Sequence, residues 1–191
     1  MMKVFVLDNY DSFTYNIVQL LECIDVHPVV KRDTDITLNQ IKLMSPDRII
    51  ISPGPMRPKD HPLIFEIIEK FHATTPIFGV CLGMQAINEF FGGSIKEADI
   101  PVHGKTSLIY HSSESLFSGI ASPFRAARYH SLIVDELAPQ AKVIAETSDG
   151  LVMALKHNSF LVSGVQFHPE SYLSEYGIEI VSNFLQSGKI S

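Results

Sequence analysis

The chain has 191 residues, of which 46% are hydrophobic and 19% charged, and a formal net charge of −6. These values are those of an ordinary globular protein, so they exclude a disordered or collagen-like chain. The acidic balance disfavours nucleic acid or an anionic membrane as the main partner, and the apolar runs fall well short of the ~20 residues that span a bilayer. The length fits one domain, residues 1–191. Because the chain has only two cysteines, Cys23 and Cys81, and no signal peptide, we expect a cytoplasmic protein without a disulfide framework.

In the first half, short apolar segments alternate with amphipathic ones, which predicts alternating strands and helices. The predicted strands are residues 3–7, 28–31, 48–52 and 77–80. The predicted helices cover about residues 13–23, 38–44, 62–71 and 82–91. Ser12 is expected to cap the first helix, and Thr37 and Gln40 form a capping box for the second.

The second half is dominated by short β-like segments and ends in a helix. The expected strands lie near residues 108–110, 126–129, 143–146, 152–155 and 160–166, and the helix covers about 174–186. The two halves predict an α/β fold with an open, mostly parallel twisted sheet, helices on both faces and added antiparallel strands in the C-terminal half. Ligands of such sheets bind beyond the carboxyl ends of the strands, where the polar segments 8–12, 53–56 and 81–83 lie.

Cys81 lies in residues 79–83 (GVCLG), between a predicted strand and a predicted helix. This sequence is typical of the glycine-flanked elbow that holds a nucleophile in a strained turn above a sheet. A helix N-terminus favours the thiolate, and the N–H of Leu82 points to where an oxyanion would form. A buried, inert cysteine explains these five residues equally well. Cys23, at the end of an amphipathic helix, is expected to pack in the core.

A thiolate nucleophile needs a base and a group that orients the base. His168 and Glu170 follow the last predicted strand, and residues two apart in an extended chain point to the same side. The carboxylate can therefore hold the imidazole, as in a nucleophile–His–acid triad, although a strand followed by a polar turn gives the same pattern. Among the other histidines His103 is ambiguous, and surface or capping positions are expected for His27, His61, His72, His111 and His157.

A second oxyanion donor is expected from a loop that contains glycine. Gly54 lies between two prolines at the end of a neighbouring strand, and its N–H is unshielded. Each such donor is worth about 3 kcal/mol in the transition state. A plain strand-terminating turn explains the same residues.

Taken together, these segments resemble the class I (triad-type) glutamine amidotransferases over essentially the whole chain. Matching blocks occur in family order at residues 8–16 (DNYDSFTYN), 52–55 (SPGP), 79–87 (GVCLGMQAI), 103–105 (HGK), 128–132 (RYHSL) and 164–171 (GVQFHPES). The first and fifth blocks look like the small glutaminase subunits of anthranilate synthase and aminodeoxychorismate synthase. The resemblance implies a flavodoxin-like arrangement of the sheet.

The resemblance also implies roles for individual residues. It implies Cys81 as nucleophile, His168 as base, Glu170 as the orienter of the base, and the N–H groups of Gly54 and Leu82 as the oxyanion hole. The residues that it implies for glutamine binding are Gly54, Met56, Gln85, His130 and Ser131. It implies neither a metal nor a cofactor.

The implied reaction is hydrolysis of L-glutamine through a cysteine thioester, with the ammonia passed to a larger chorismate-binding synthase subunit. The motifs occupy residues 8–171, which leaves no room for that synthase, and we expect the loop at residues 8–12 to contact it. Two departures from the family concern the surroundings of the site. Met84 stands where the family usually has His, and residues 56–62 (MRPKDHP) replace a loop that in many relatives begins with Gly or Cys.

Three alternatives to this function stay open at the level of sequence. The chain could be the glutaminase of another class I amidotransferase that feeds a nucleotide synthetase, or a catalytically silent regulatory relative. It could also be a flavodoxin-like binding module, although that predicts a phosphate-binding loop where residues 8–12 are acidic.

Overall fold

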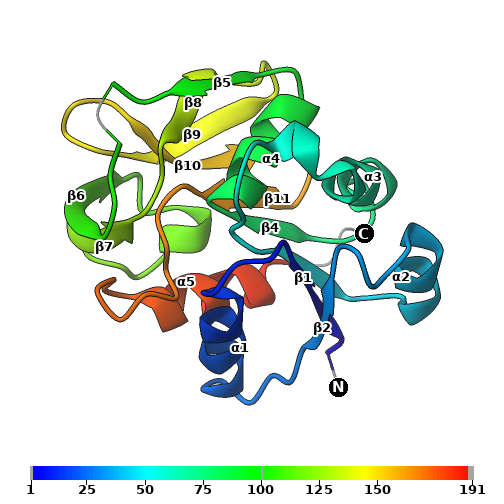
Figure 1. Cartoon of the computed structure of the whole chain (residues 1–191). Coiled ribbons are helices and arrows are strands. Elements are labelled where there is room, and N and C mark those ends of the chain that lie inside the picture. Colours follow the sequence, from blue (N-terminus) through cyan, green and yellow to red (C-terminus); the bar gives the residue numbers. More distant parts are fainter. Residues whose placement is uncertain (1, 100, 189–191) are drawn as a thin grey trace.

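The computed structural model describes residues 2–99 and 101–188, and its main element is a nine-stranded sheet (Figure 1). The strand order is β2-β1-β3-β4-β11-β10-β9-β6-β7. The parallel part consists of β1 (Val4–Asp8), β2 (Val29–Arg32), β3 (Arg48–Ile51), β4 (Ile77–Val80) and β11 (Val162–Val165). The antiparallel part consists of β10 (Val152–His157), β9 (Ala141–Glu146), β6 (Lys105–His111) and β7 (Phe124–Arg128). The predicted mixed sheet is therefore confirmed.

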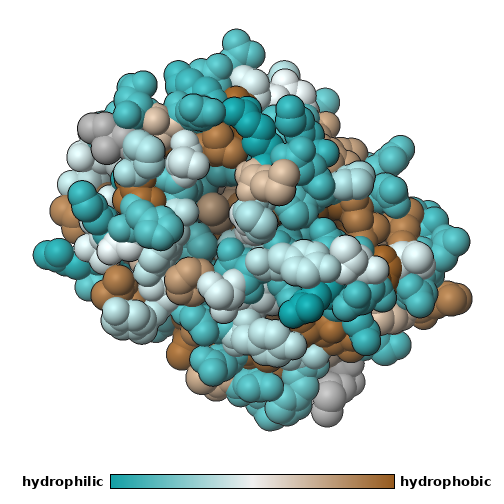
Figure 2. Space-filling model, in the orientation of Figure 1, coloured by the Kyte–Doolittle hydropathy of each residue, from teal (hydrophilic) through white to brown (hydrophobic). Residues whose placement is uncertain are grey.

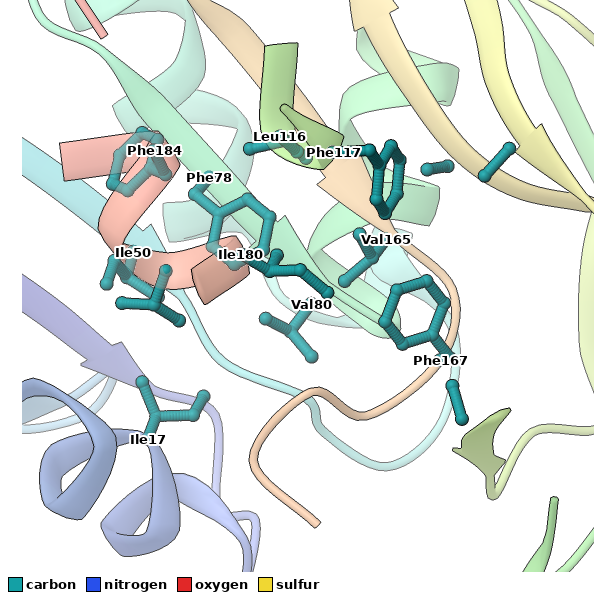
Figure 3. Packing of buried hydrophobic residues seen from close by; sticks show 14 of the residues in the cluster. Ile17, Ile50, Phe78, Val80, Leu116, Phe117, Val165, Phe167, Ile180 and Phe184 are labelled. Atoms are coloured by element: carbon teal, nitrogen blue, oxygen red, sulfur yellow. The ribbon is translucent and has the colours of Figure 1, made fainter. Parts of the chain in front are cut away.

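Helices cover both faces of the sheet, as predicted. On one face lie α1 (Thr14–Glu22) and α5 (Gly177–Gln186), and on the other α2 (Leu38–Met44), α3 (Pro62–Phe71) and α4 (Leu82–Phe90). Figure 3 shows the first face, where Ile180 and Phe184 of α5 lie over Phe78 of β4. The rings of Phe78 and Phe184 stack with their centroids 5.3 Å apart. Burying one such side chain contributes about 1.5–3 kcal/mol.

A second, two-stranded sheet of β5 (Ser94–Glu97) and β8 (Leu132–Glu136) was not expected from the sequence. Asn88 on α4 holds it in place. The Asn88 Nδ2 donates to the carbonyls of Ser94 (3.1 Å) and Glu136 (2.9 Å), and its Oδ1 accepts from the N–H of Ala138 (2.9 Å). Short 3₁₀ helices occur at Pro58–Asp60 and Ser115–Phe117.

Three local predictions are wrong. Ser12 does not cap α1: the helix begins at Thr14, and the carboxylate of Asp11 accepts the N–H of Phe13 instead (2.8 Å). The last helix begins at Gly177, three residues later than expected. Cys23 is exposed because it lies just beyond the end of α1, off the apolar face that Ile17 and Leu21 bury. The Thr37–Gln40 capping box is confirmed.

The surface in the view of Figure 2 is mostly hydrophilic, with hydrophobic residues scattered in small groups. Leu43 on α2 and Tyr172 are among the exposed large hydrophobic side chains. Within residues 2–99 and 101–188, none of the helices combines the length and the apolar character needed to cross a bilayer.

Candidate active site

The loops that follow β3, β4 and β7 surround a pocket of about 280 Å³ at the carboxyl edge of the parallel strands. Its lining residues include Gly54, Pro55, Met56, Cys81, Gln85, His103, Tyr129, His130, Ser131 and Leu132. Six of these are residues that the sequence assigned to the nucleophile or to glutamine binding: Gly54, Met56, Cys81, Gln85, His130 and Ser131. Segments far apart in the sequence therefore meet at the edge where the topology predicts a ligand.

Cys81 occupies a strained elbow between β4 and α4. Its φ is 51° and its ψ −100°, a combination that costs a non-glycine residue about 1–3 kcal/mol. The elbow closes tightly because both flanking glycines are in close contact with backbone. A Cβ on Gly79 would lie 2.4 Å from the carbonyl carbon of Gly83, and one on Gly83 would lie 2.6 Å from the carbonyl oxygen of Ile51. Both positions therefore require glycine, which explains the glycine pattern around Cys81.

His168 and Glu170 form a buried pair just beyond the end of β11. His168 Nδ1 lies 2.7 Å from Glu170 Oε1, and the side chains of the two residues are 3% and 0% exposed. The backbone of His168 is fixed by its N–H, which donates to the carbonyl of Ala127 on β7 (2.9 Å). The rings of Phe13 and Tyr129 pack against the imidazole. The i, i+2 relation predicted for the two residues is thus present in the structure.

The other ring nitrogen of His168 is left for Cys81. His168 Nε2 is buried and has no well-aligned hydrogen-bond partner in the part of the chain that the structure describes. Burial lowers the pKa of His168, but interactions with the Cys81 sulfur and the Glu170 carboxylate outweigh it and raise this pKa well above its usual value of about 6.5. The imidazolium form of His168 is therefore favoured at neutral pH, between the Glu170 side chain and the Cys81 sulfur.

Gln166 is a residue of the site that sequence reasoning missed. Its Nε2 donates to Cys81 Sγ at 3.5 Å, and its Oε1 accepts from Gln85 Nε2 at 3.2 Å. Gln85 Nε2 also donates to the carbonyl of Leu132 (3.2 Å), which leaves the Gln85 Oε1 for a ligand. The signal was available, because Gln166 lies two residues before His168 and so projects to the same side of the extended chain.

The side chain of His130 is hydrogen-bonded within the protein and is not available to bind a ligand. Burial, followed by the charge of Arg128, lowers the pKa of His130 to about 4, so the ring is neutral at pH 7. Its Nδ1 donates to the carbonyl of Leu132 (2.9 Å) and its Nε2 accepts from Arg128 Nε (3.1 Å). The N–H groups of His130 and Ser131 have no acceptor among the described residues. These two N–H groups suit the glutamine-binding role that the resemblance implied for His130 and Ser131.

Gly54 and Leu82 lie against each other beside the elbow. A Cβ on Gly54 would be 2.5 Å from Leu82 Cδ2, and neither residue's N–H is hydrogen-bonded within the described part of the chain. The loop is anchored by Asn9, which is fully buried: its N–H donates to Ser52 Oγ and its Nδ2 to the Ser52 carbonyl, both at 3.0 Å. Asn9 therefore belongs to the support of the site.

Two histidines are more buried than predicted. His157, expected at the surface, is 5% exposed within β10 and packs against the rings of Phe91 and Phe160. His61 is at the N-cap of α3 but its side chain does not cap the helix, and it is 7% exposed. Among the described residues, no group of three or more His, Cys, Asp or Glu side chains is arranged to bind a metal ion.

Comparisons with known proteins agree on one family. The family model "Glutamine amidotransferase class-I" matches residues 5–187. The chain is 46% identical over 186 residues to aminodeoxychorismate/anthranilate synthase component 2 of Bacillus subtilis, covering 96% of each chain. It is 47% identical over 189 residues to anthranilate synthase component 2 of Thermus thermophilus, covering 97% of this chain and 92% of that one.

Among solved structures, a candidate GMP synthase subunit of Thermoplasma acidophilum superposes with a TM-score of 0.86 at 24% identity. The match covers 97% of this chain and 92% of that one, and shows that the two share a fold. The family match removes the alternative of a flavodoxin-like binding module. The chain belongs to the class I glutamine amidotransferases.

Proposed function

We propose that this chain is the glutaminase subunit of an anthranilate or aminodeoxychorismate synthase. It hydrolyses the side-chain amide of L-glutamine and passes the ammonia to a larger chorismate-binding subunit. Its curated relatives named as component 2 of these synthases support the pathway. The observation that carries the chemistry is the buried His168–Glu170 pair, held at 2.7 Å beside a cysteine in a strained elbow at the wall of a pocket.

In the first half of the reaction, the Cys81 thiolate attacks the side-chain amide carbon of glutamine. The N–H groups of Gly54 and Leu82 stabilise the oxyanion, an effect worth about 3 kcal/mol per donor. The His168 imidazolium gives its Nε2 proton to the amide nitrogen. Ammonia leaves, and a γ-glutamyl thioester on Cys81 and a neutral His168 remain.

In the second half, the neutral His168 takes a proton from a water molecule. The resulting hydroxide attacks the thioester carbon, glutamate leaves, and the thiolate and imidazolium are restored. Glu170 keeps Nδ1 protonated and the ring oriented throughout. General acid–base assistance of this kind contributes about 10²–10⁴-fold to the rate.

Glutamine would lie in the pocket with its side-chain amide at Cys81 and its amino-acid end toward Gln85 and residues 130–131. The Gln85 Oε1 suits the ammonium group, and the N–H groups of Met56, His130 and Ser131, which have no acceptor among the residues that the structure describes, suit a carboxylate. The bound synthase would take up the ammonia near the opening of this pocket. Tyr10 (50% exposed) is the accessible apolar side chain of the 8–12 loop, whereas Asn9 is buried and unavailable for contact.

The two cysteines provide the test of this proposal. Ammonia release from glutamine should be lost in Cys81→Ala and retained in Cys23→Ala, because Cys23 is exposed. The reaction should be run with each candidate chorismate-binding subunit, glutamine and chorismate, and the aromatic product identified. If Cys81→Ala released ammonia at the wild-type rate, the proposed chemistry would be wrong. If the ammonia were used only by a nucleotide synthetase, the result would instead favour the alternative that the chain is the glutaminase of such an enzyme.

A further inference from the structure

His61 bridges two groups that belong to different parts of the sheet edge. Its Nδ1 lies 3.1 Å from Asp33 Oδ2, and its Nε2 lies 3.0 Å from the carbonyl oxygen of Pro55. Asp33 follows β2, and its N–H donates to the carbonyl of Asp8 at the end of β1 (3.2 Å). Pro55 belongs to the loop that follows β3 and lines the pocket.

We propose, on the basis of the function proposed above, that His61 and Asp33 are positioning residues for glutamine binding. They hold the Pro55–Met56 peptide in the one orientation that presents the Met56 N–H to the substrate carboxylate. The pair would act from behind the pocket wall, since His61 itself does not line the pocket whereas Pro55 and Met56 do.

The planarity of the peptide bond supports this role. In a trans peptide the C=O of one residue and the N–H of the next point in opposite directions. A hydrogen bond from His61 to the Pro55 carbonyl therefore turns the Met56 N–H away from His61. That N–H has no acceptor within residues 2–99 and 101–188, so it is available to a ligand.

The loop needs such a restraint because of the backbone of Met56. Its φ is 65°, in the left-handed region that a non-glycine residue enters at a cost. Its side chain is 70% exposed and packs too little to hold the backbone there. The bond to His61 supplies a restraint from the interior of the protein.

The chemistry of the bridge explains why two residues are needed. The Asp33 carboxylate and the Pro55 carbonyl each face one ring nitrogen of His61, so the ring is held from both sides. The bridge is largely shielded from water, since the side chains of His61 and Asp33 are 7% and 16% exposed. Asp33 thus fixes the orientation of the ring, and the ring fixes the Pro55 carbonyl.

A matched pair of substitutions separates the two bonds. The amide nitrogen of Asn reaches the place of the histidine Nδ1, so His61→Asn keeps the bond to Asp33 and loses the bond to Pro55. The amide nitrogen of Gln reaches the place of Nε2, so His61→Gln keeps the bond to Pro55. Asp33→Asn keeps the shape of the side chain at position 33 and removes the negative charge of the carboxylate.

The readout is labelling of Cys81 by a chloroketone analogue of L-glutamine, followed by mass spectrometry over a range of analogue concentrations. His61→Asn should raise the half-saturating concentration about tenfold, the effect of one lost hydrogen bond to a charged group, with the maximal rate less affected. His61→Gln should stay within about twofold of wild type, because it keeps the bond to Pro55. Asp33→Asn should have an intermediate effect, because an amide still bonds to the ring but holds it less strongly than a carboxylate does. If His61 only stabilised the fold, its variants would have lower thermal stability, and the half-saturating concentration would not change more than the maximal labelling rate.

A second measurement does not depend on glutamine. In ¹H–¹⁵N spectra of the free protein, the Met56 amide resonance should move or broaden in His61→Asn and keep its place in His61→Gln. If the two variants match each other in both labelling and spectra, the positioning role is wrong. If wild type is not labelled at Cys81 while the Met56 resonance responds as expected, the glutaminase function is wrong and the restraint on the loop stands.

Discussion

Gly79→Ala should damage both the stability of the protein and the reactivity of its nucleophile. The added Cβ would lie 2.4 Å and 2.5 Å from the carbonyl carbon and oxygen of Gly83, and 2.6 Å from the backbone nitrogen of Met84. All three atoms are backbone in the first turn of α4, so none can rotate away. Because ordinary contacts begin at 3.4 Å, α4 must move away from β4 by about 1 Å.

Overpacking of this kind costs about 1–3 kcal/mol, which urea unfolding measures directly. The elbow residue Cys81 lies between the two elements that must separate. A misplacement of about 1 Å in a reacting group reduces rates about 10²-fold, so labelling of Cys81 by the chloroketone analogue should slow by that order.

Gly188→Ala is the matched control. A Cβ there meets nothing within 4 Å, and the residue does not require a positive φ. Its effect on stability should stay within about 0.5 kcal/mol. If Gly79→Ala unfolded at the wild-type urea concentration and reacted at the wild-type rate, the close contact between β4 and α4 would not be what shapes the elbow.

Three further predictions concern the groups around the sulfur. Glu170→Gln should lower the pKa of His168, because it removes the charge that favours the imidazolium; an NMR titration of the ring would contradict this if the midpoint did not move. Since the folded pKa of His168 lies above the unfolded value of about 6.5, its contribution to stability is complete below that pH. It should be lost as the pH rises through the folded pKa, so wild-type urea midpoints should fall over this range, and those of Glu170→Gln should fall less. Gln166→Leu removes the donor to Cys81 Sγ and should slow analogue labelling about tenfold, whereas alkylation of the exposed Cys23 by iodoacetamide should be unchanged.

The parallel half of the fold was predictable because its strands carry an unambiguous signal. β3 and β4 are buried along their whole length and, apart from Arg48, read as continuous apolar runs between polar turns, as strands covered on both faces do. The β5–β8 sheet carries no such signal, since Ser94–Glu97 is short and half polar. It depends on the amide of Asn88, a contact between residues 48 positions apart in the sequence.

The candidate site likewise contains residues that the sequence predicts and residues whose place depends on the folded chain. Local backbone rules, a glycine-flanked turn and an i, i+2 pair, made Cys81, His168 and Glu170 candidates, and the family resemblance implied their roles. The burial of His61 depends on Asp33 and Pro55, which approach it only in the folded chain. Cys23 was misplaced because the end of an amphipathic helix does not reveal where its apolar face stops.

The insertion of β11 beside β4 has a consequence for how the protein is made. Gly164 and Val165 pair with Gly79 and Val80, so the strand that leads to His168 lies directly against the strand that leads to Cys81. Gln166 and Cys81 are 85 positions apart, and the four antiparallel strands lie between them in the sequence. During synthesis the elbow emerges well before the acid–base pair. The acid–base pair therefore reaches Cys81 only when nearly the whole chain has folded, so a chain truncated before residue 168 would lack it.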